Sequence, residues 1–211
     1  MTAQDMAGRV YQKMRTRNAI VAAAAELSRT GRDVTMPEVA RAALVPEATA
    51  YRYFPDLVSL LQEAIAGQLP GPEEAFGPLD GSTDPVARIA AAAEFLLRHV
   101  LSRQGVVRAL IAATVIRPVQ AQARPGLRFG LIDSALTPLS DTLGVTDPAA
   151  LAQLKRDLAV VVSAEALFTL TDLHGLSPEE AIASIVYTAT TLTRAAAQAA
   201  ARVRRSSWHK Q

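Results

Sequence analysis

Residues 45–54, VPEATAYRYF, concentrate the side chains of this chain that are best suited to contact a charged or hydrogen-bonding partner. Thr49, Tyr51, Arg52 and Tyr53 place three hydroxyls and one guanidinium within five residues. These groups donate hydrogen bonds to phosphate oxygens and to base edges, and a tyrosine ring also packs against apolar surface. The stretch holds three of the ten aromatic residues of the chain. The stretch therefore either packs in the centre of a small core or forms a surface that contacts a partner.

The sequence shows no pattern for catalysis or metal binding. The absence of cysteine excludes disulfides, thiolate catalysis and cysteine-ligated metals. His99, His174 and His209 lie far apart, and none has another histidine at a metal-ligand spacing. We find no phosphate-binding glycine loop, no dinucleotide fingerprint and no nucleophilic serine elbow. We therefore expect no catalytic residues, no metal and no cofactor, and a protein that is not an enzyme.

Length and composition favour one class of fold. The chain has 211 residues, of which half are hydrophobic and only 5% are aromatic. Much of the hydrophobic half is alanine, the strongest helix former, so we expect an all-α fold with a well buried core. The N-terminus lacks the apolar run of a signal peptide, and the most apolar segment, 158–170, is too short to span a bilayer. We expect a cytoplasmic protein that contacts no membrane.

The stretch 45–54 is expected to form the second of two short helices. The sequence TMPE at 35–38 has the form of a capping box, with Pro37 in the first turn of a helix that continues through 39–43. A further short helix is expected at about 47–54. It must end there, because Pro55 disfavours helical geometry in the preceding residue.

Longer helical patterns flank this pair. A basic amphipathic helix is predicted at about 9–29, before Gly31, and a fourth helix at about 57–69, after a capping Asp56. The segment 70–85 is rich in Pro and Gly and is predicted to be a loop or hinge. Five longer helices are predicted beyond it, at about 85–103, 105–117, 125–143, 148–173 and 178–204.

A basic helix followed by two short helices and a tight turn is the pattern of a helix-turn-helix. At this point the sequence TMPEVARAALVPEATAYRYFPDLVSLLQEAI resembles the DNA-binding region of the tetracycline-repressor (TetR) family of bacterial regulators. The resemblance covers about a quarter of the chain. The matching residues are Thr35, Val39, Ala40, Ala43, Val45, Thr49, Tyr51, Tyr53, Phe54 and Leu60.

The resemblance implies an N-terminal three-helix DNA-binding domain at 1–56, with its helix-turn-helix at about 35–54. It also implies a ligand-binding and dimerisation domain of five to six helices at 57–211. Phe54 is expected in the core against Ile20 and Leu27, rather than on DNA. The residues expected to contact DNA are Thr35, Met36, Glu47, Ala48, Thr49, Tyr51, Arg52 and Tyr53.

Three positions depart from the family pattern. Leu44 stands in the turn where the family usually has glycine, so we expect another turn geometry, because a bulky residue at positive φ is strained. Pro46 replaces the usual capping residue and offers no capping oxygen. Leu57 stands where the family commonly has a phosphate-binding lysine, so Arg52 or the basic N-terminal arm is expected to supply that charge.

The last two predicted helices carry apolar residues at alternating steps of three and four. Such stripes suit a four-helix interface between two subunits, and the resemblance implies a homodimer through about 148–173 and 178–204. The alternative is that both stripes pack within one subunit. The stripes comprise Leu151, Leu154, Leu158, Val161, Glu165 and Phe168 in one helix and Ile182, Ile185, Ala189, Leu192 and Ala196 in the other.

Glu165 is the one carboxylate in its stripe. Because an unpaired buried carboxylate is costly, we expect it to meet an arginine or to lie at a wet rim, and a ligand contact is the less favoured reading. The helices that the family uses to enclose its ligands supply the candidate pocket residues, which are Phe95, His99, Leu110, Arg117, Phe129, Glu165 and Phe168.

The resemblance implies a ligand-responsive regulator, most simply a repressor, that binds double-stranded DNA at a near-palindromic operator and is released by an unidentified small-molecule effector. Two alternatives stay open. One is a helical small-molecule-binding protein or enzyme with a vestigial helix-turn-helix. The other is an interaction module whose N-terminal half holds a protein partner.

Overall fold

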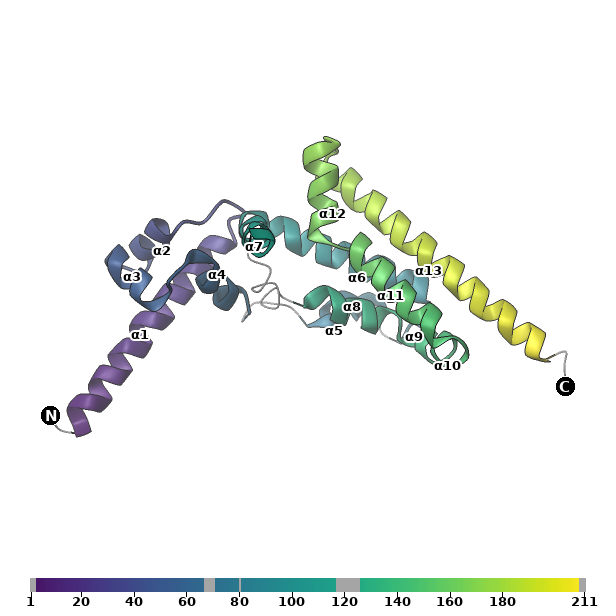
Figure 1. The fold of residues 1–211 in the computed structure, drawn as a ribbon, viewed down its shortest axis with the longest axis horizontal. Coiled ribbons are helices and arrows are strands. Elements are labelled where there is room, and N and C mark those ends of the chain that lie inside the picture. The colour runs from purple at the N-terminus through teal and green to yellow at the C-terminus, as the bar shows by residue number, and fades with distance from the viewer. Residues whose placement is uncertain (1–2, 67–70, 80, 117–125, 209–211) are drawn as a thin grey trace. The chain divides into compact units, whose positions relative to one another are not determined.

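The computed structural model describes residues 3–66, 71–79, 81–116 and 126–208 (Figure 1). Within these ranges all regular elements are helices, which confirms the predicted all-α fold. The chain divides into two compact units. Unit 1 comprises Met1–Leu69 and Leu101–Pro125, and unit 2 comprises Pro70–Val100 and Gly126–Gln211.

Unit 1 contains the predicted helix-turn-helix. The capping box at α2 is formed, because the Thr35 hydroxyl accepts from the Glu38 N–H at 3.4 Å and the Glu38 carboxylate accepts from the Thr35 N–H at 3.0 Å. Asp56 caps α4 as predicted, since its Oδ1 accepts from the Ser59 N–H at 2.7 Å. The helices are α1 (Ala3–Ser28), α2 (Met36–Ala42), α3 (Glu47–Tyr53), α4 (Leu57–Ala66) and α7 (Gln104–Ile116).

The core of unit 1 lies between α1 and the helices α2, α3 and α4. Phe54 is 3% exposed and lies in one cluster with Ile20, while Leu27 packs against the cluster's edge, so the predicted core position of Phe54 is confirmed. Burying an aromatic or aliphatic side chain of this size contributes roughly 1.5–3 kcal/mol. Val106 and Leu110 of α7 belong to the same cluster. Helix α7 therefore contributes to the same core as the helix-turn-helix.

Gly105 allows α7 to begin against the loop between α1 and α2. A β-carbon on Gly105 would lie 2.3 Å from the carbonyl oxygen of Arg32, so any larger residue would force the loop away. Gly31 in that loop has φ +69°, a conformation that glycine adopts without strain. It follows the end of α1, as the sequence predicted.

Unit 2 contains most of the longer helices. Its elements are α5 (Pro72–Phe76), a 3₁₀ turn (Gly77–Leu79), α6 (Pro85–Ser102, whose last two residues belong to unit 1), α8 (Leu127–Ala135), α9 (Thr137–Ser140), α10 (Leu143–Thr146), α11 (Pro148–Val161), α12 (Ala164–Phe168), a π-helical turn (Thr169–Leu173) and α13 (Pro178–Trp208). None of the helices in the described ranges is long and apolar enough to cross a membrane.

Three sequence predictions in unit 2 are wrong. The predicted helix at 148–173 breaks at Val162, whose ψ of +74° is not helical, and Ser163 caps a new helix by accepting from the Ala166 N–H at 3.1 Å. The predicted helix at 125–143 is also interrupted, because α8 ends at Ala135 and a separate short helix begins at Thr137 with Pro138 in its first turn. The predicted loop at 70–85 contains α5, which starts with Pro72 in its first turn.

The apolar stripes of α11 and α13 pack against each other within one chain. Leu154 and Leu158 of α11 are buried, and so are Ile182, Ile185 and Ala189 of α13. For these side chains the structure favours packing inside the subunit over an interface between subunits.

Candidate DNA-binding site

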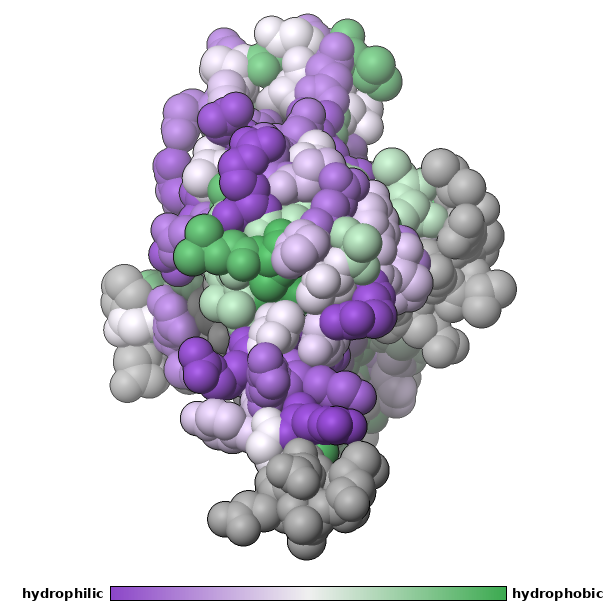
Figure 2. Space-filling model, turned by 90° about the vertical axis from the view of Figure 1, so that its left-hand side faces the viewer, coloured by the Kyte–Doolittle hydropathy of each residue, from purple (hydrophilic) through white to green (hydrophobic). Residues whose placement is uncertain are grey.

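Helix α3 is anchored by its small and aromatic residues and presents its polar ones. Ala50 is completely buried and Phe54 closes the helix with extended backbone, so the opposite side of α3 is free. Figure 2 looks onto this side of unit 1, where hydrophilic residues surround an apolar patch. Of the predicted DNA contacts in α3, Glu47, Ala48, Tyr51 and Arg52 are exposed, and Thr49 and Tyr53 are half-buried.

The two tyrosines differ in their surroundings. Tyr51 is 46% exposed, whereas Tyr53 packs its ring against the core of unit 1. The guanidinium of Arg52 lies 5.7 Å from the centre of the Tyr53 ring. A cation at this distance from an aromatic face is attracted to it, which orders the arginine next to the exposed face of α3.

The start of α2 provides a second polar edge. Thr35 is exposed, and its hydroxyl donates to the Glu38 carboxylate at 2.7 Å. This hydrogen bond, a second one from the Thr35 backbone, and the positive charges of Arg32 and Arg41 hold the pKa of Glu38 below its ordinary value. The side chain of Met36 lies in the core at 3% exposure, so only its backbone is available to a partner.

The turn between α2 and α3 has the left-handed backbone geometry that a leucine at this position was expected to avoid. Leu44 has φ +56°, the left-handed conformation that glycine favours, and no other non-glycine residue in the described ranges has a positive φ. The Val45 N–H donates to the Ala40 carbonyl at 3.0 Å and the Leu44 N–H donates to the Arg41 carbonyl at 3.2 Å. These are the two hydrogen bonds of a Schellman motif. The prediction of another turn geometry is therefore wrong, because these bonds satisfy the last carbonyls of α2 despite the strain.

The structure agrees with the expectations for Pro46 and Leu57. Pro46 precedes α3 without a side-chain capping bond, and its carbonyl accepts from the Thr49 N–H at 2.9 Å. Leu57 is half-buried against the core of unit 1. No cation therefore occupies the position of the family's lysine.

Arg17 ties α1 to the elements on either side of the recognition helix. Its guanidinium pairs with both carboxylate oxygens of Glu63 on α4 and lies 5.1 Å from the centre of the Phe54 ring. One side chain thus joins α1, the end of α3 and α4. Further towards the N-terminus of α1, Lys13 and Arg15 are exposed.

An open hollow of about 640 Å³ adjoins Thr35 and Glu38 in unit 1. Its other walls come from the loop after α1 and the first turn of α7. The sequence did not single out these residues, because nothing in its local pattern brings residues near 32 and near 105 together. The lining residues are Gly31, Arg32, Asp33, Thr35, Glu38, Gln104, Gly105 and Arg108.

The predicted ligand-pocket residues do not all lie together. Leu110 belongs to the core of unit 1, and Arg117 lies outside the described residues. In unit 2, Phe168 is buried, and Phe95 and His99 on α6 are half-buried.

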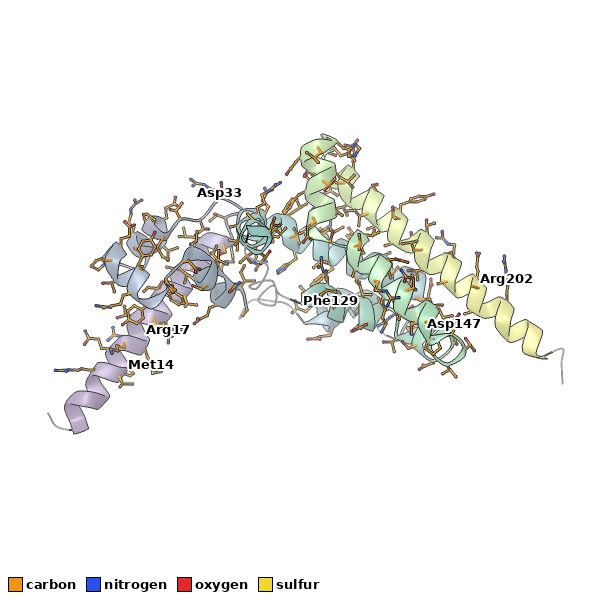
Figure 3. The ribbon with its side chains drawn as sticks, viewed as in Figure 1. Met14, Arg17, Asp33, Phe129, Asp147 and Arg202 are labelled. Atoms are coloured by element: carbon orange, nitrogen blue, oxygen red, sulfur yellow. The ribbon has the colours of Figure 1, made fainter. Side chains whose placement is uncertain are left out.

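The carboxylate of Glu165 pairs with Arg128 at 3.4 Å, which is the structural partner the sequence led us to expect. The Arg128 guanidinium lies 4.9 Å from the centre of the ring of Phe129, which is itself exposed (Figure 3). Arg128 therefore connects two of the predicted pocket residues. Across the described ranges, no cluster of three or more histidine, aspartate or glutamate side chains is arranged to hold a metal ion.

Comparison with known proteins agrees with this geometry. Residues 19–64 match the model of the bacterial regulatory proteins of the tetR family. The crystal structure of a TetR transcriptional regulator from Rhodococcus sp. RHA1 superposes with a TM-score of 0.50 at 23% sequence identity, over 85% of this chain and 97% of that one. That likeness supports the fold, and a comparison with curated proteins gives no match. The matched segment spans the last ten residues of α1, the complete helix-turn-helix and most of α4, so the chain carries the DNA-binding region of the tetR family of bacterial regulatory proteins.

Proposed function

We propose that this regulator is a repressor that binds a near-palindromic operator as a homodimer and is released from it by a small molecule. The observation that carries the proposal is the presentation of α3. Its buried Ala50 and the adjoining Phe54 fix the helix in unit 1, while Glu47, Tyr51 and Arg52 are exposed on its free side. A short helix anchored in this way can enter the major groove with its N-terminal residues at base edges.

The proposed contacts with DNA form two groups, those to base edges and those to phosphates. Glu47 and Ala48 at the start of α3 meet base edges, where a carboxylate accepts from a cytosine amino group. Tyr51, Arg52 and Tyr53 reach phosphate oxygens, and Thr49 offers its hydroxyl to either. At the start of α2, the backbone N–H of Met36 donates to a further phosphate, and the Thr35 hydroxyl joins it by releasing its bond to the Glu38 carboxylate. Because Leu57 offers no charge, Arg52 and the exposed Lys13 and Arg15 of α1 supply the electrostatic part of the affinity.

Dimerisation uses the sides of α11 and α13 that the single chain leaves open. The inward sides of these helices are occupied by their own contact, as described above. On their outer sides, Val160 is 73% exposed and Tyr187 is 71% exposed. A second copy covers these side chains and sets two copies of α3 about 34 Å apart, one turn of the DNA helix.

The effector acts in unit 2, near the half-buried Phe95 and His99 and the buried Phe168. Release requires that the effector prefer the conformation with low affinity for the operator, because a ligand that binds both conformations equally shifts neither. A screen for compounds that lower the affinity of the chain for DNA would identify the effector.

The experiment is a binding titration of the full chain against duplexes that flank its own coding region. We expect one duplex to bind tightly, and we expect the affinity to fall steeply with salt. Tyr51→Ala and Arg52→Ala should weaken that binding, and Arg52→Ala should also reduce the salt slope by about 1. Arg156→Ala, which removes an exposed arginine of α11, is the matched control and should bind as the unsubstituted chain does.

Two results would count against the proposal. If Tyr51→Ala and Arg52→Ala remain folded and bind with unchanged affinity, α3 is not the recognition helix. If no duplex is preferred over a random one, a helical small-molecule-binding protein with a vestigial helix-turn-helix becomes the better reading.

A further inference from the structure

Leu44 combines two features that each cost free energy. Its φ of +56° strains a residue that has a β-carbon, and its side chain is 92% exposed, the highest value among the large apolar residues described as exposed. A glycine here would remove both costs at once. Strain of this kind clusters where a side chain serves a contact, so Leu44 needs an explanation outside the folding of the chain.

The position of Leu44 restricts what it can contact. It lies three residues before α3, and the Schellman hydrogen bonds of Val45 and Leu44 fix the backbone on which it stands. The residues between it and the first turn of α3 are also open, since Pro46, Glu47 and Ala48 are exposed. Leu44 therefore belongs to the entrance of the recognition helix.

We propose that Leu44 contacts the C5-methyl group of a thymine in the major groove of the operator and so helps to determine which sequence is bound. This inference rests on the proposed function and adds a base contact to it. The thymine methyl is an apolar group that the major groove presents, and an aliphatic side chain recognises it without hydrogen bonds. Such a contact contributes specificity that does not depend on salt, unlike the phosphate contact of the positively charged Arg52.

Replacement of thymine by uracil tests the contact, because it removes only the methyl group. The probe is the tightest duplex recovered from a random-sequence library by the full chain. Each thymine of one half-site, and its symmetry mate, is replaced in turn by uracil. We expect one thymine position at which uracil weakens binding by about fourfold per half-site, the value of one buried methyl group.

Variants of Leu44 connect that loss to this side chain. Leu44→Gly and Leu44→Asn both tolerate the left-handed conformation and lack the aliphatic group, so they should bind thymine and uracil duplexes equally. Leu44→Met keeps an apolar side chain and should retain most of the discrimination. Thermal unfolding of each variant shows that it is folded.

The outcomes separate the inference from the proposed function. If the chain selects a duplex but discriminates thymine from uracil equally well with Leu44→Gly, the contact is wrong while the proposed DNA binding stands. If Leu44→Gly changes self-association and leaves every thymine preference intact, the exposed leucine serves a protein contact and the inference is overturned. If no duplex is selected, both fail.

Discussion

At the residue scale, the left-handed backbone of Leu44 should make the chain less stable than a glycine variant. Relief of left-handed strain contributes roughly 1–2 kcal/mol, and the greater freedom of glycine in the unfolded chain removes part of this gain. We expect Leu44→Gly to raise the free energy of unfolding of unit 1 by about 1 kcal/mol, as measured by denaturant titration. Leu44→Ala is the control, because its β-carbon keeps the strain. An equal gain in Leu44→Ala would show that exposure, and not backbone strain, sets the cost.

Phe54 and Met36 show which side-chain positions could be predicted from the sequence. The burial of Phe54 was predictable, because Pro55 ends the helix and leaves a large aromatic ring at its close. Met36 was predicted to contact DNA, and its side chain is buried with those of Val39 and Ala40. The three residues lie three and four positions apart, which places them on one face of α2. The hollow beside Thr35 depends on contacts between distant segments, and no local pattern reports those.

At the element scale, helix starts were easier to predict than helix breaks. The caps at Thr35, Asp56 and Asp147 and the stop at Gly31 all carry residue types with a known local role. The break at Val162 carries no glycine or proline, and only the capping hydroxyl of Ser163 marks it. The apolar stripe across that break has helical spacing on both sides, so periodicity alone could not reveal it.

Two helix starts should make the stability of the chain depend on pH. Hydrogen bonds from Thr35 hold the pKa of Glu38 below its ordinary value, and hydrogen bonds from Ser177 do the same for Glu180. A carboxyl group with a lowered pKa in the folded state stabilises that state above its unfolded pKa, near 4.3 for glutamate, and this contribution is lost as the pH falls through the folded pKa. We expect the unfolding midpoint to fall as the pH is lowered below about 4.3.

Substitution of both carboxylates identifies them as the source of this acid sensitivity. The double variant Glu38→Gln with Glu180→Gln should show a smaller loss of stability on acidification. Part of the loss should remain, because a hydrogen bond from Arg98 lowers the pKa of Glu179 as well. The control variant Thr35→Ser retains a hydroxyl and should follow the unsubstituted chain. An unchanged pH profile in the double variant would contradict the assignment of the acid sensitivity to these helix starts.

At the scale of the whole molecule, the burial of the α11 and α13 stripes changes where a dimer interface can lie. The sequence could report that each helix has an apolar face, but not whether the covering surface belongs to the same chain or to a second one. Ile182 and Ile185 are now accounted for within the subunit. Val160 and Tyr187 on the same two helices are exposed, so they are the large apolar side chains of this helix pair that remain open to a second copy.

Charge placed on these open faces should therefore separate the proposed dimer into subunits that stay folded. We expect Val160→Asp combined with Tyr187→Arg to sediment as a monomer, while its helical content stays that of the unsubstituted chain. Operator affinity should fall by roughly 10²- to 10⁴-fold, because the second half-site no longer benefits from linkage to the first. Val145→Glu on α10 is the matched control, since Val145 is also exposed, and it should leave both association and affinity unchanged. A double variant that still dimerises and binds its operator with full affinity would place the interface on another surface.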